Sequence, residues 1–172
     1  MINWFHLTWL VFHVITFHTV FDKPKYYHKF FYSFTELIPC SKCKNHYKEK
    51  IEYPNESMNQ HLNNLNLFNW MVDIHNDINN ENKQKIWSYE DAYKLYKNKI
   101  LTKQDIFNFF NFYITYNNRK NNNRKYLVEM IISMIYILPE NTIYDIYKDF
   151  LHKNPLNEDN LERWFILFQK IQ

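Results

Sequence analysis

The chain contains no glycine among its 172 residues, and this absence limits the folds open to it more than any other feature. Rossmann and P-loop nucleotide sites need glycine where the backbone approaches a phosphate closely, so both classes are excluded. Tight hairpins with glycine turns are unfavourable as well. The hydrophobic pattern is helical almost throughout, without a convincing run of alternating apolar and polar residues. The sequence therefore predicts an all-α protein.

Prolines, asparagines and polar turns divide the predicted helices. Pro24 suits the first turn of a helix, where its missing N–H is not needed. Ser88 and Asp91 resemble a capping box, and Asn141 and Asn157 are candidate N-caps. The expected helices span about 4–20, 24–37, 39–52, 58–80, 88–96, 102–116, 125–138, 141–152 and 157–171.

Composition narrows the classes of partner. The chain is 46% hydrophobic and 20% aromatic, which favours a large core and ligands with flat rings. The net charge of +3 is small and the basic residues are scattered, so we expect no nucleic-acid partner. Residues 4–21 are apolar, but histidines and threonines interrupt them. A buried aromatic helix is therefore favoured there over a membrane anchor or signal peptide, and no membrane span is expected.

Both cysteines lie in the segment Ile38-Pro39-Cys40-Ser41-Lys42-Cys43. Two cysteines separated by two residues can close a small reversible disulfide. Pro39 suggests that a helix starts here, and the positive end of a helix dipole lowers the pKa of a thiol in its first turn. Lys42 and Lys44 act in the same direction. These features favour a redox-active dithiol.

Three other interpretations of this motif remain open at this point. Zinc needs four ligands, and Cys40, Cys43 and His46 supply only three, so no metal is expected. Thioredoxin-like exchange requires a βαβ framework, and no strands are predicted. A structural bridge or two inert thiols would also satisfy the pattern.

A second cluster lies on the predicted helix 58–80. Trp70 is followed by His75, Asn76 and Asn79, and His75 and Asn79 share a helix face because they are four residues apart. Imidazole and amide groups on one face can bind a flat heteroaromatic ligand through hydrogen bonds. Asparagine is common in this chain, so a solvated face beside a core tryptophan is the alternative.

A third element is the pair Trp9 and His13 on the first predicted helix. Their spacing of four places both rings on one side. Considered alone, His13 would be interpreted as a satisfied core histidine.

Taken together and in order, WxxxH, PCxxC and W-x4-HN-x-I-N resemble the ERV/ALR-type FAD-linked sulfhydryl oxidases. The segment from Trp87 to Tyr96 looks like the tail of large-DNA-virus members of that family. The resemblance covers about residues 3–97. It implies an FAD-binding sulfhydryl oxidase domain over 1–97, built as a four-helix bundle with a short fifth helix. Residues 98–172 would form an accessory helical region.

The resemblance also assigns roles to individual residues. Cys40 and Cys43 would be catalytic, with Cys43 next to the flavin and Cys40 the interchange thiol. The family lysine falls between Lys83 and Lys85, so both are candidates. Residues expected to line or pack the FAD pocket are Trp9, His13, Tyr47, His75, Asn76, Ile78, Asn79, Lys83, Lys85 and Trp87.

The implied activity oxidises dithiols in protein substrates and passes the electrons through Cys40 and Cys43 to FAD and then to O2, which gives H2O2. The chain has no second cysteine pair to act as a shuttle, which suggests a separate thioredoxin-like carrier. A homodimer is also implied. The compartment would be the host cytoplasm or virion for a viral protein, and the mitochondrial intermembrane space for a cellular one.

The chain departs from the family pattern in its first helix. Phe5 and His6 stand where the family has a Gly/Arg element, and residues 98–172 have no counterpart in the minimal domain. A noncatalytic helical interaction protein or virion structural protein, with a decayed oxidase domain, is therefore the alternative function.

Overall fold

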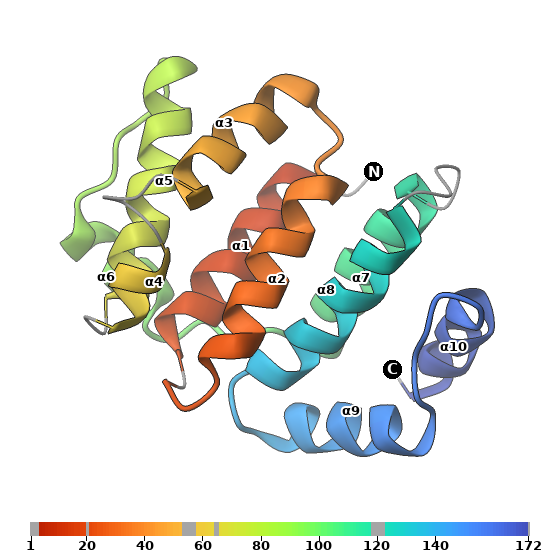
Figure 1. The fold of residues 1–172 in the computed structure, drawn as a ribbon. Helices are drawn as coiled ribbons and strands as arrows, with labels where there is room; N and C mark the ends of the chain where they lie inside the picture. Colours follow the sequence, from red (N-terminus) through yellow and green to blue (C-terminus); the bar gives the residue numbers. More distant parts are fainter. Residues whose placement is uncertain (1–3, 20, 53–57, 64–65, 118–122, 172) are drawn as a thin grey trace.

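The computed structural model describes residues 4–19, 21–52, 58–63, 66–117 and 123–171. All regular structure within these residues is helical (Figure 1), which confirms the predicted fold class. The described helices are α1 (Trp4–Phe17), α2 (Pro24–Leu37), α3 (Ser41–Glu52), α4 (Met58–Asn63), α5 (Leu67–Glu81), α6 (Tyr89–Tyr96), α7 (Lys103–Asn117), α8 (Arg124–Ile137), α9 (Thr142–Lys153) and α10 (Leu161–Phe168), with a 3-10 turn at Gln169–Ile171.

Helix α1 is apolar on nearly all sides because it is surrounded by protein. The hydroxyl groups of its buried threonines have hydrogen-bond partners within the helix. Thr8 Oγ1 donates to the Trp4 carbonyl at 2.8 Å, and Thr16 Oγ1 donates to the Phe12 carbonyl at 2.8 Å. No described helix is both long and apolar enough to cross a bilayer.

Several predicted helix starts are confirmed by the hydrogen bonds at those positions. Helix α2 begins at Pro24. Ser88 Oγ accepts the N–H of Asp91 at 3.1 Å and caps α6. Asn141 Oδ1 caps α9 by accepting the N–H groups of Ile143 and Tyr144 at 2.9 and 3.1 Å.

Other boundaries were predicted wrongly. The first helix ends at Phe17, three residues before the expected position. The single helix expected over 58–80 is two helices, α4 and α5, separated in an asparagine-rich stretch. Asparagine weakens helices because its amide competes for backbone hydrogen bonds. Helix α3 begins at Ser41 rather than Pro39.

The last predicted helix also starts later than expected. Asn157 Oδ1 accepts the N–H groups of Asp159 and Asn160, each at 3.0 Å. It therefore stabilises the turn before α10 rather than capping the helix, which begins at Leu161.

Helices α1 and α2 lie at the centre of the molecule (Figure 1). Helix α1 packs against α5 and α7, and α2 packs most extensively against α8. Buried side chains from every described α-helix except α6 belong to one hydrophobic cluster, and Tyr96 of α6 packs against it. The division into domains at residues 97 and 98 stays a prediction, and the core crosses that position.

Candidate functional site

The two cysteines form a disulfide where α3 begins. The Cα atoms of Cys40 and Cys43 are 5.2 Å apart. The N–H of Cys43 points to Cys40 Sγ at 3.2 Å, and the N–H of Lys44 donates to the Cys40 carbonyl at 2.8 Å. The Cys40 sulfur thus lies at the positive end of α3, where a thiolate would be stabilised.

The three residues of the zinc interpretation have other partners in this structure. Both sulfurs are bonded to each other, and His46 Nδ1 lies 3.0 Å from a carboxylate oxygen of Glu81. In the described residues, no group of three His, Cys, Asp or Glu side chains is arranged to hold a metal ion.

A small apolar cavity of about 40 Å³ lies on one side of the disulfide. Cys43 lines this cavity, whereas Cys40 does not. The two cysteines are therefore placed differently, and Cys43 is the one that borders an aromatic interior. The lining residues are Trp4, Phe5, Thr8, Trp9, Phe12, Phe34, Ile38, Cys43, Tyr47 and Ile78.

A larger polar cavity of about 750 Å³ adjoins the apolar one. Phe5 and Trp9 line both cavities and so form the partition between them. The other residues that line the polar cavity are His6, His75, Asn79, Asn82, Gln84, Lys85, Trp87 and Tyr96.

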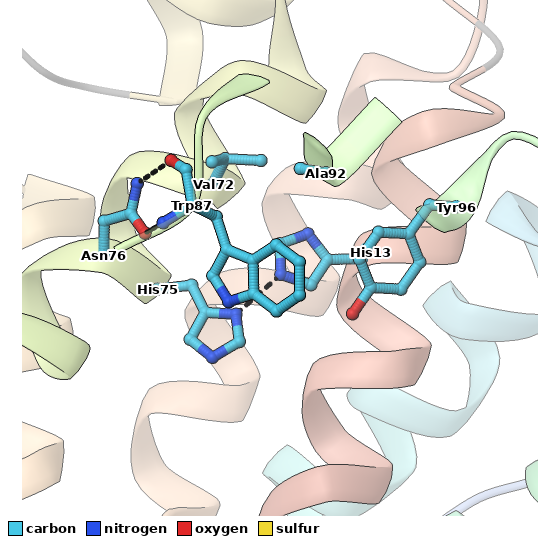
Figure 2. A pocket seen from close by; sticks show the side chains of 7 residues that line it. All are labelled: His13, Val72, His75, Asn76, Trp87, Ala92 and Tyr96. Atoms are coloured by element: carbon cyan, nitrogen blue, oxygen red, sulfur yellow. Dashed lines mark hydrogen bonds between the residues drawn. The ribbon is translucent and has the colours of Figure 1, made fainter. Parts of the chain in front are cut away.

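A cluster of aromatic and imidazole rings lies at this site, and Figure 2 shows three of its members, His13, His75 and Tyr96, in a small neighbouring pocket. The rings of Trp9 and His75 are parallel, with centroids 3.9 Å apart and an interplanar angle of 5°. His13 Nε2 and His75 Nδ1 are 2.8 Å apart, so they share one hydrogen bond. The ring of Tyr96 stacks on the other side of His13, with centroids 4.5 Å apart.

Burial keeps both histidines neutral. It lowers the pKa of His13 to about 3, and the neighbouring His75 adds to this effect. Burial also lowers the pKa of His75 to about 4, with a smaller contribution from His6. Two neutral imidazoles, one a donor and one an acceptor, make a hydrogen bond without a buried charge.

Two buried donors or acceptors in this cluster have no hydrogen-bond partner. They are the indole nitrogen Nε1 of Trp9 and the ring nitrogen Nδ1 of His13. Leaving such a group unsatisfied costs free energy, and a bound ligand is one way to satisfy it.

The amides of α5 hold the loop that closes the polar cavity. Asn76 exchanges two hydrogen bonds with the backbone of Trp87, donating to its carbonyl at 2.8 Å and accepting its N–H at 2.9 Å (Figure 2). Asn79 donates to the Lys85 carbonyl at 2.9 Å. The Asn76 amide is thus engaged with protein backbone. Asn76 also lines a small pocket with His13 and His75, and its role in binding FAD stays a prediction.

A comparison with known protein families decides the classification. The family model described as Erv1 / Alr family matches residues 6–100. The chain belongs to the Erv1/Alr family. It is also similar to a protein of Acanthamoeba polyphaga mimivirus that is named as a probable FAD-linked sulfhydryl oxidase, with 34% identity over 94 residues. That match covers 52% of this chain and 62% of the mimivirus protein, so the chain spans less than two thirds of that relative. No solved structure matches the chain.

The Erv1/Alr motifs converge in space, although they are far apart in the sequence. Trp9 and His13 of α1 meet His75 of α5, while Ile78 and Tyr47 join Cys43 around the apolar cavity. The Tyr47 hydroxyl is buried and donates to the Phe31 carbonyl at 3.3 Å. Burial raises its pKa well above that of a free tyrosine.

The two candidate lysines are placed differently. Lys85 lines the polar cavity, with its Nζ 4.4 Å from the centroid of the Trp87 ring. Lys83 has a positive φ of 53° and does not line either cavity. Of the two lysines, Lys85 is thus the one placed at the polar cavity, and its contact with FAD stays a prediction.

Sequence reasoning missed several residues of this site. Phe5 and Phe12 lie four before and three after Trp9, so helical spacing alone could have identified them. Phe34 and Ile38 reach the cavity only through the packing of α2, and Tyr96 only through the position of α6. No local pattern in the sequence marks these three.

Proposed function

We propose that the protein is an FAD-dependent thiol oxidase that forms disulfides in protein substrates. The observation that carries this proposal is the different placement of the two cysteines: Cys43, but not Cys40, borders the aromatic cavity partitioned by Trp9. Such an arrangement lets electrons enter at one sulfur and leave toward a flat-ring cofactor at the other. Membership of the Erv1/Alr family and the name of the mimivirus relative support this proposal.

The residues of the site suit the chemical groups of FAD. Aromatic and aliphatic side chains beside Cys43 suit an isoalloxazine ring, and the partnerless Trp9 Nε1 can donate to it. Lys85 lines the larger cavity, where a cation suits a pyrophosphate. A three-ring flavin exceeds the 40 Å³ of the apolar cavity, so the partition formed by Phe5 and Trp9 must open to admit it.

Substrate oxidation is a thiol–disulfide exchange. A substrate thiolate attacks Cys40 Sγ, the bond between Cys40 and Cys43 breaks, and Cys43 leaves as a thiolate. The second substrate thiolate then attacks the substrate sulfur joined to Cys40, which forms the substrate disulfide and releases Cys40 as a thiolate. Two electrons now reside on the cysteine pair. FAD supplies the capacity to take up these two electrons and deliver them to O2, which gives H2O2.

The environment of the cysteines favours these steps. The N-terminal end of α3 stabilises negative charge on Cys40 Sγ as it leaves the mixed disulfide. The neutral His13–His75 pair stacks with Trp9 and keeps a buried positive charge out of the ring cluster. Because the chain has no other cysteine, every electron pair must pass through Cys40 and Cys43.

The proposed oxidase is expected to have two partners, a carrier protein and a second copy of the chain. A thioredoxin-like carrier is expected to bring electrons from folded proteins, because this chain has no shuttle pair. If the purified enzyme oxidised folded proteins as fast as small dithiols, no carrier would be needed. We also propose a homodimer, which sedimentation equilibrium of the purified protein tests by mass.

The test of the proposed activity combines a visible spectrum with an oxygen electrode. The purified protein should be yellow, and dithiothreitol should cause O2 uptake with H2O2 production. Cys40→Ser and Cys43→Ser should each abolish uptake, while Cys40→Ser keeps the flavin bound. A colourless protein without dithiol-dependent O2 uptake would instead support the noncatalytic interaction or virion structural role.

A further inference from the structure

The C-terminal region holds the chain segment that leads into the disulfide. The Tyr116 hydroxyl of α7 donates to the Pro39 carbonyl at 3.2 Å, and this carbonyl belongs to the peptide bond that joins Pro39 to Cys40. Asn117, the last residue of α7, donates to the Leu37 carbonyl at 3.3 Å. Two consecutive residues of α7 therefore bind the backbone just before the redox motif.

These bonds supply partners that the local structure lacks. Leu37 is the last residue of α2, and carbonyls in the last turn of a helix have no partner within the helix. Asn117 is 1% exposed, and its Oδ1 accepts a hydrogen bond from Asn123 at 2.7 Å. Asn123 also donates to the Glu36 carbonyl at 3.3 Å, which extends the same arrangement.

Helix α7 also supports the wall of the apolar cavity. The Tyr113 hydroxyl lies 2.7 Å from Thr8 Oγ1, and the ring of Phe112 stacks on Trp4 with an interplanar angle of 6°. Thr8 and Trp4 line the cavity together with Cys43. One helix of the accessory region thus contacts both the cavity wall and the approach to Cys40.

We propose that Tyr116 and Asn117 are positioning residues that hold Cys40 within closing distance of Cys43. When the disulfide is reduced, the Leu37–Cys40 connection would gain backbone freedom and the sulfurs would separate. Hydrogen bonds from a packed helix limit that freedom, which raises the effective concentration of one thiol at the other. The clamp formed by Tyr116 and Asn117 therefore stabilises the disulfide and favours its re-formation after each turnover.

The equilibrium part of this proposal does not depend on a bound flavin. Only its consequence for turnover rests on the proposed oxidase function. In a glutathione buffer, two reduced glutathione molecules give up two electrons and two protons to the Cys40–Cys43 disulfide, forming one oxidised glutathione and two protein thiols. The ratio of disulfide to dithiol at equilibrium therefore measures how much the clamp stabilises the disulfide.

The experiment uses the full chain with Tyr116→Phe or Asn117→Ala, equilibrated in mixtures of reduced and oxidised glutathione and quenched by alkylation. We expect the equilibrium constant that favours the disulfide to fall about three- to tenfold in each variant, as loss of one hydrogen bond implies. A tenfold fall raises the reduction potential by about 30 mV. Tyr136→Phe removes a tyrosine hydroxyl from α8 where its ring stacks on Tyr26, near the start of α2 and at the opposite end of that helix from Leu37, and it should leave the constant unchanged.

Tyr116→Phe decides the test because it keeps the ring and removes only the hydroxyl of a side chain that is 36% exposed. Loss of about 1 kcal/mol lowers the melting temperature of a chain of this size by only about 2–4 °C, so the variant stays folded in the assay and a shifted equilibrium would not reflect unfolding. An equilibrium constant within twofold of the wild-type value in Tyr116→Phe would overturn the proposal. A colourless wild type would contradict the oxidase function but would leave this measurement valid.

Discussion

Trp9 and His75, which are 66 positions apart in the sequence, stack face to face with ring centroids 3.9 Å apart. The stack joins α1 to α5 at the partition between the apolar and the polar cavity. It also leaves Trp9 Nε1 buried without a hydrogen-bond acceptor. The pair is thus both a structural contact between two helices and the surface that a flavin would meet.

The indole of Trp9 is expected to contribute to flavin binding. Trp9→Phe keeps an aromatic ring but removes the N–H donor and part of the stacking surface. We expect the affinity for FAD to fall about five- to thirtyfold, which corresponds to about 1–2 kcal/mol. Fluorescence titration of the flavin-free protein with FAD measures this change.

The control for this variant is Trp164→Phe. Trp164 Nε1 donates to the Asn154 carbonyl at 2.8 Å in the C-terminal core. Its replacement should lower the melting temperature and leave FAD affinity unchanged. Equal losses of affinity in both variants would show that Trp9 acts only through overall stability.

The two lysines after the HN motif should differ in their effect on the cofactor. Lys85 lines the polar cavity, whereas Lys83 does not. We expect Lys85→Ala to weaken FAD binding about fivefold, or about 1 kcal/mol, and to reduce its salt dependence. Lys83→Ala is the matched control, and a larger effect of Lys83→Ala would reverse the assignment.

The Asn76 amide should stabilise the loop that carries Trp87. Asn76→Ala removes two hydrogen bonds and leaves the N–H and carbonyl of Trp87 without their partner. We expect the free energy of unfolding to fall by about 1–3 kcal/mol in urea titrations. Trypsin should also cleave faster after Lys85.

Asn80→Ala, at an exposed position of the same helix, controls for the loss of an asparagine from α5. It should change neither stability nor the rate of cleavage appreciably. If Asn76→Ala behaved like Asn80→Ala, the paired amide would not be the element that holds the loop.

The neutral histidine pair should make stability depend on pH. The pKa values of about 3 for His13 and about 4 for His75 lie below that of an unfolded histidine, about 6.5. As the pH falls below about 6.5, the unfolded chain takes up protons that the folded chain refuses. The contribution of this neutral pair to the free energy of unfolding is therefore complete above about pH 6.5 and is lost as the pH falls toward 4.

Urea unfolding between pH 7 and pH 5 measures this dependence. Each histidine that stays neutral in the fold contributes about 2 kcal/mol in total between pH 7 and pH 5, or about 1 kcal/mol per pH unit on average. His13→Gln should reduce the slope of stability against pH by about that amount, while His152→Gln serves as the exposed control. An unchanged slope in His13→Gln would mean that His13 takes up its proton at the same pH in the folded and the unfolded chain, which would contradict the neutral pair.

The sequence was sufficient to predict the helices and the order of the motifs, because helical periodicity and capping residues are local signals. Pro24, Ser88 and Asn141 begin or cap helices at the expected positions. The prediction of one long helix over 58–80 was wrong. Each asparagine lowers helix stability, these costs add up where asparagines cluster, and packing decides whether the helix continues. Asn157 was wrongly predicted as an N-cap, because an N-cap and a turn use the same kind of hydrogen bond from the side chain to the backbone.

The roles of side chains at the site were less predictable. The HN motif predicts that Asn76 lines the flavin site, and this stays a prediction. The motif did not indicate that the Asn76 amide would bond the Trp87 backbone. The clamp from Tyr116 and Asn117 has no signature in the sequence, since it depends on where α7 ends relative to α2. Contacts between distant segments are decided by packing, which a single sequence does not display.

The central claim is that electrons pass from Cys40 and Cys43 to a bound flavin. An anaerobic titration of the purified protein with dithiothreitol, followed in the visible flavin band, tests it most directly. We predict that the band bleaches within about two equivalents of dithiol in the wild type, because the disulfide and the flavin each accept two electrons, and that it persists in Cys43→Ser. Bleaching at the same rate in Cys43→Ser, or a wild-type protein without a flavin band, would contradict it.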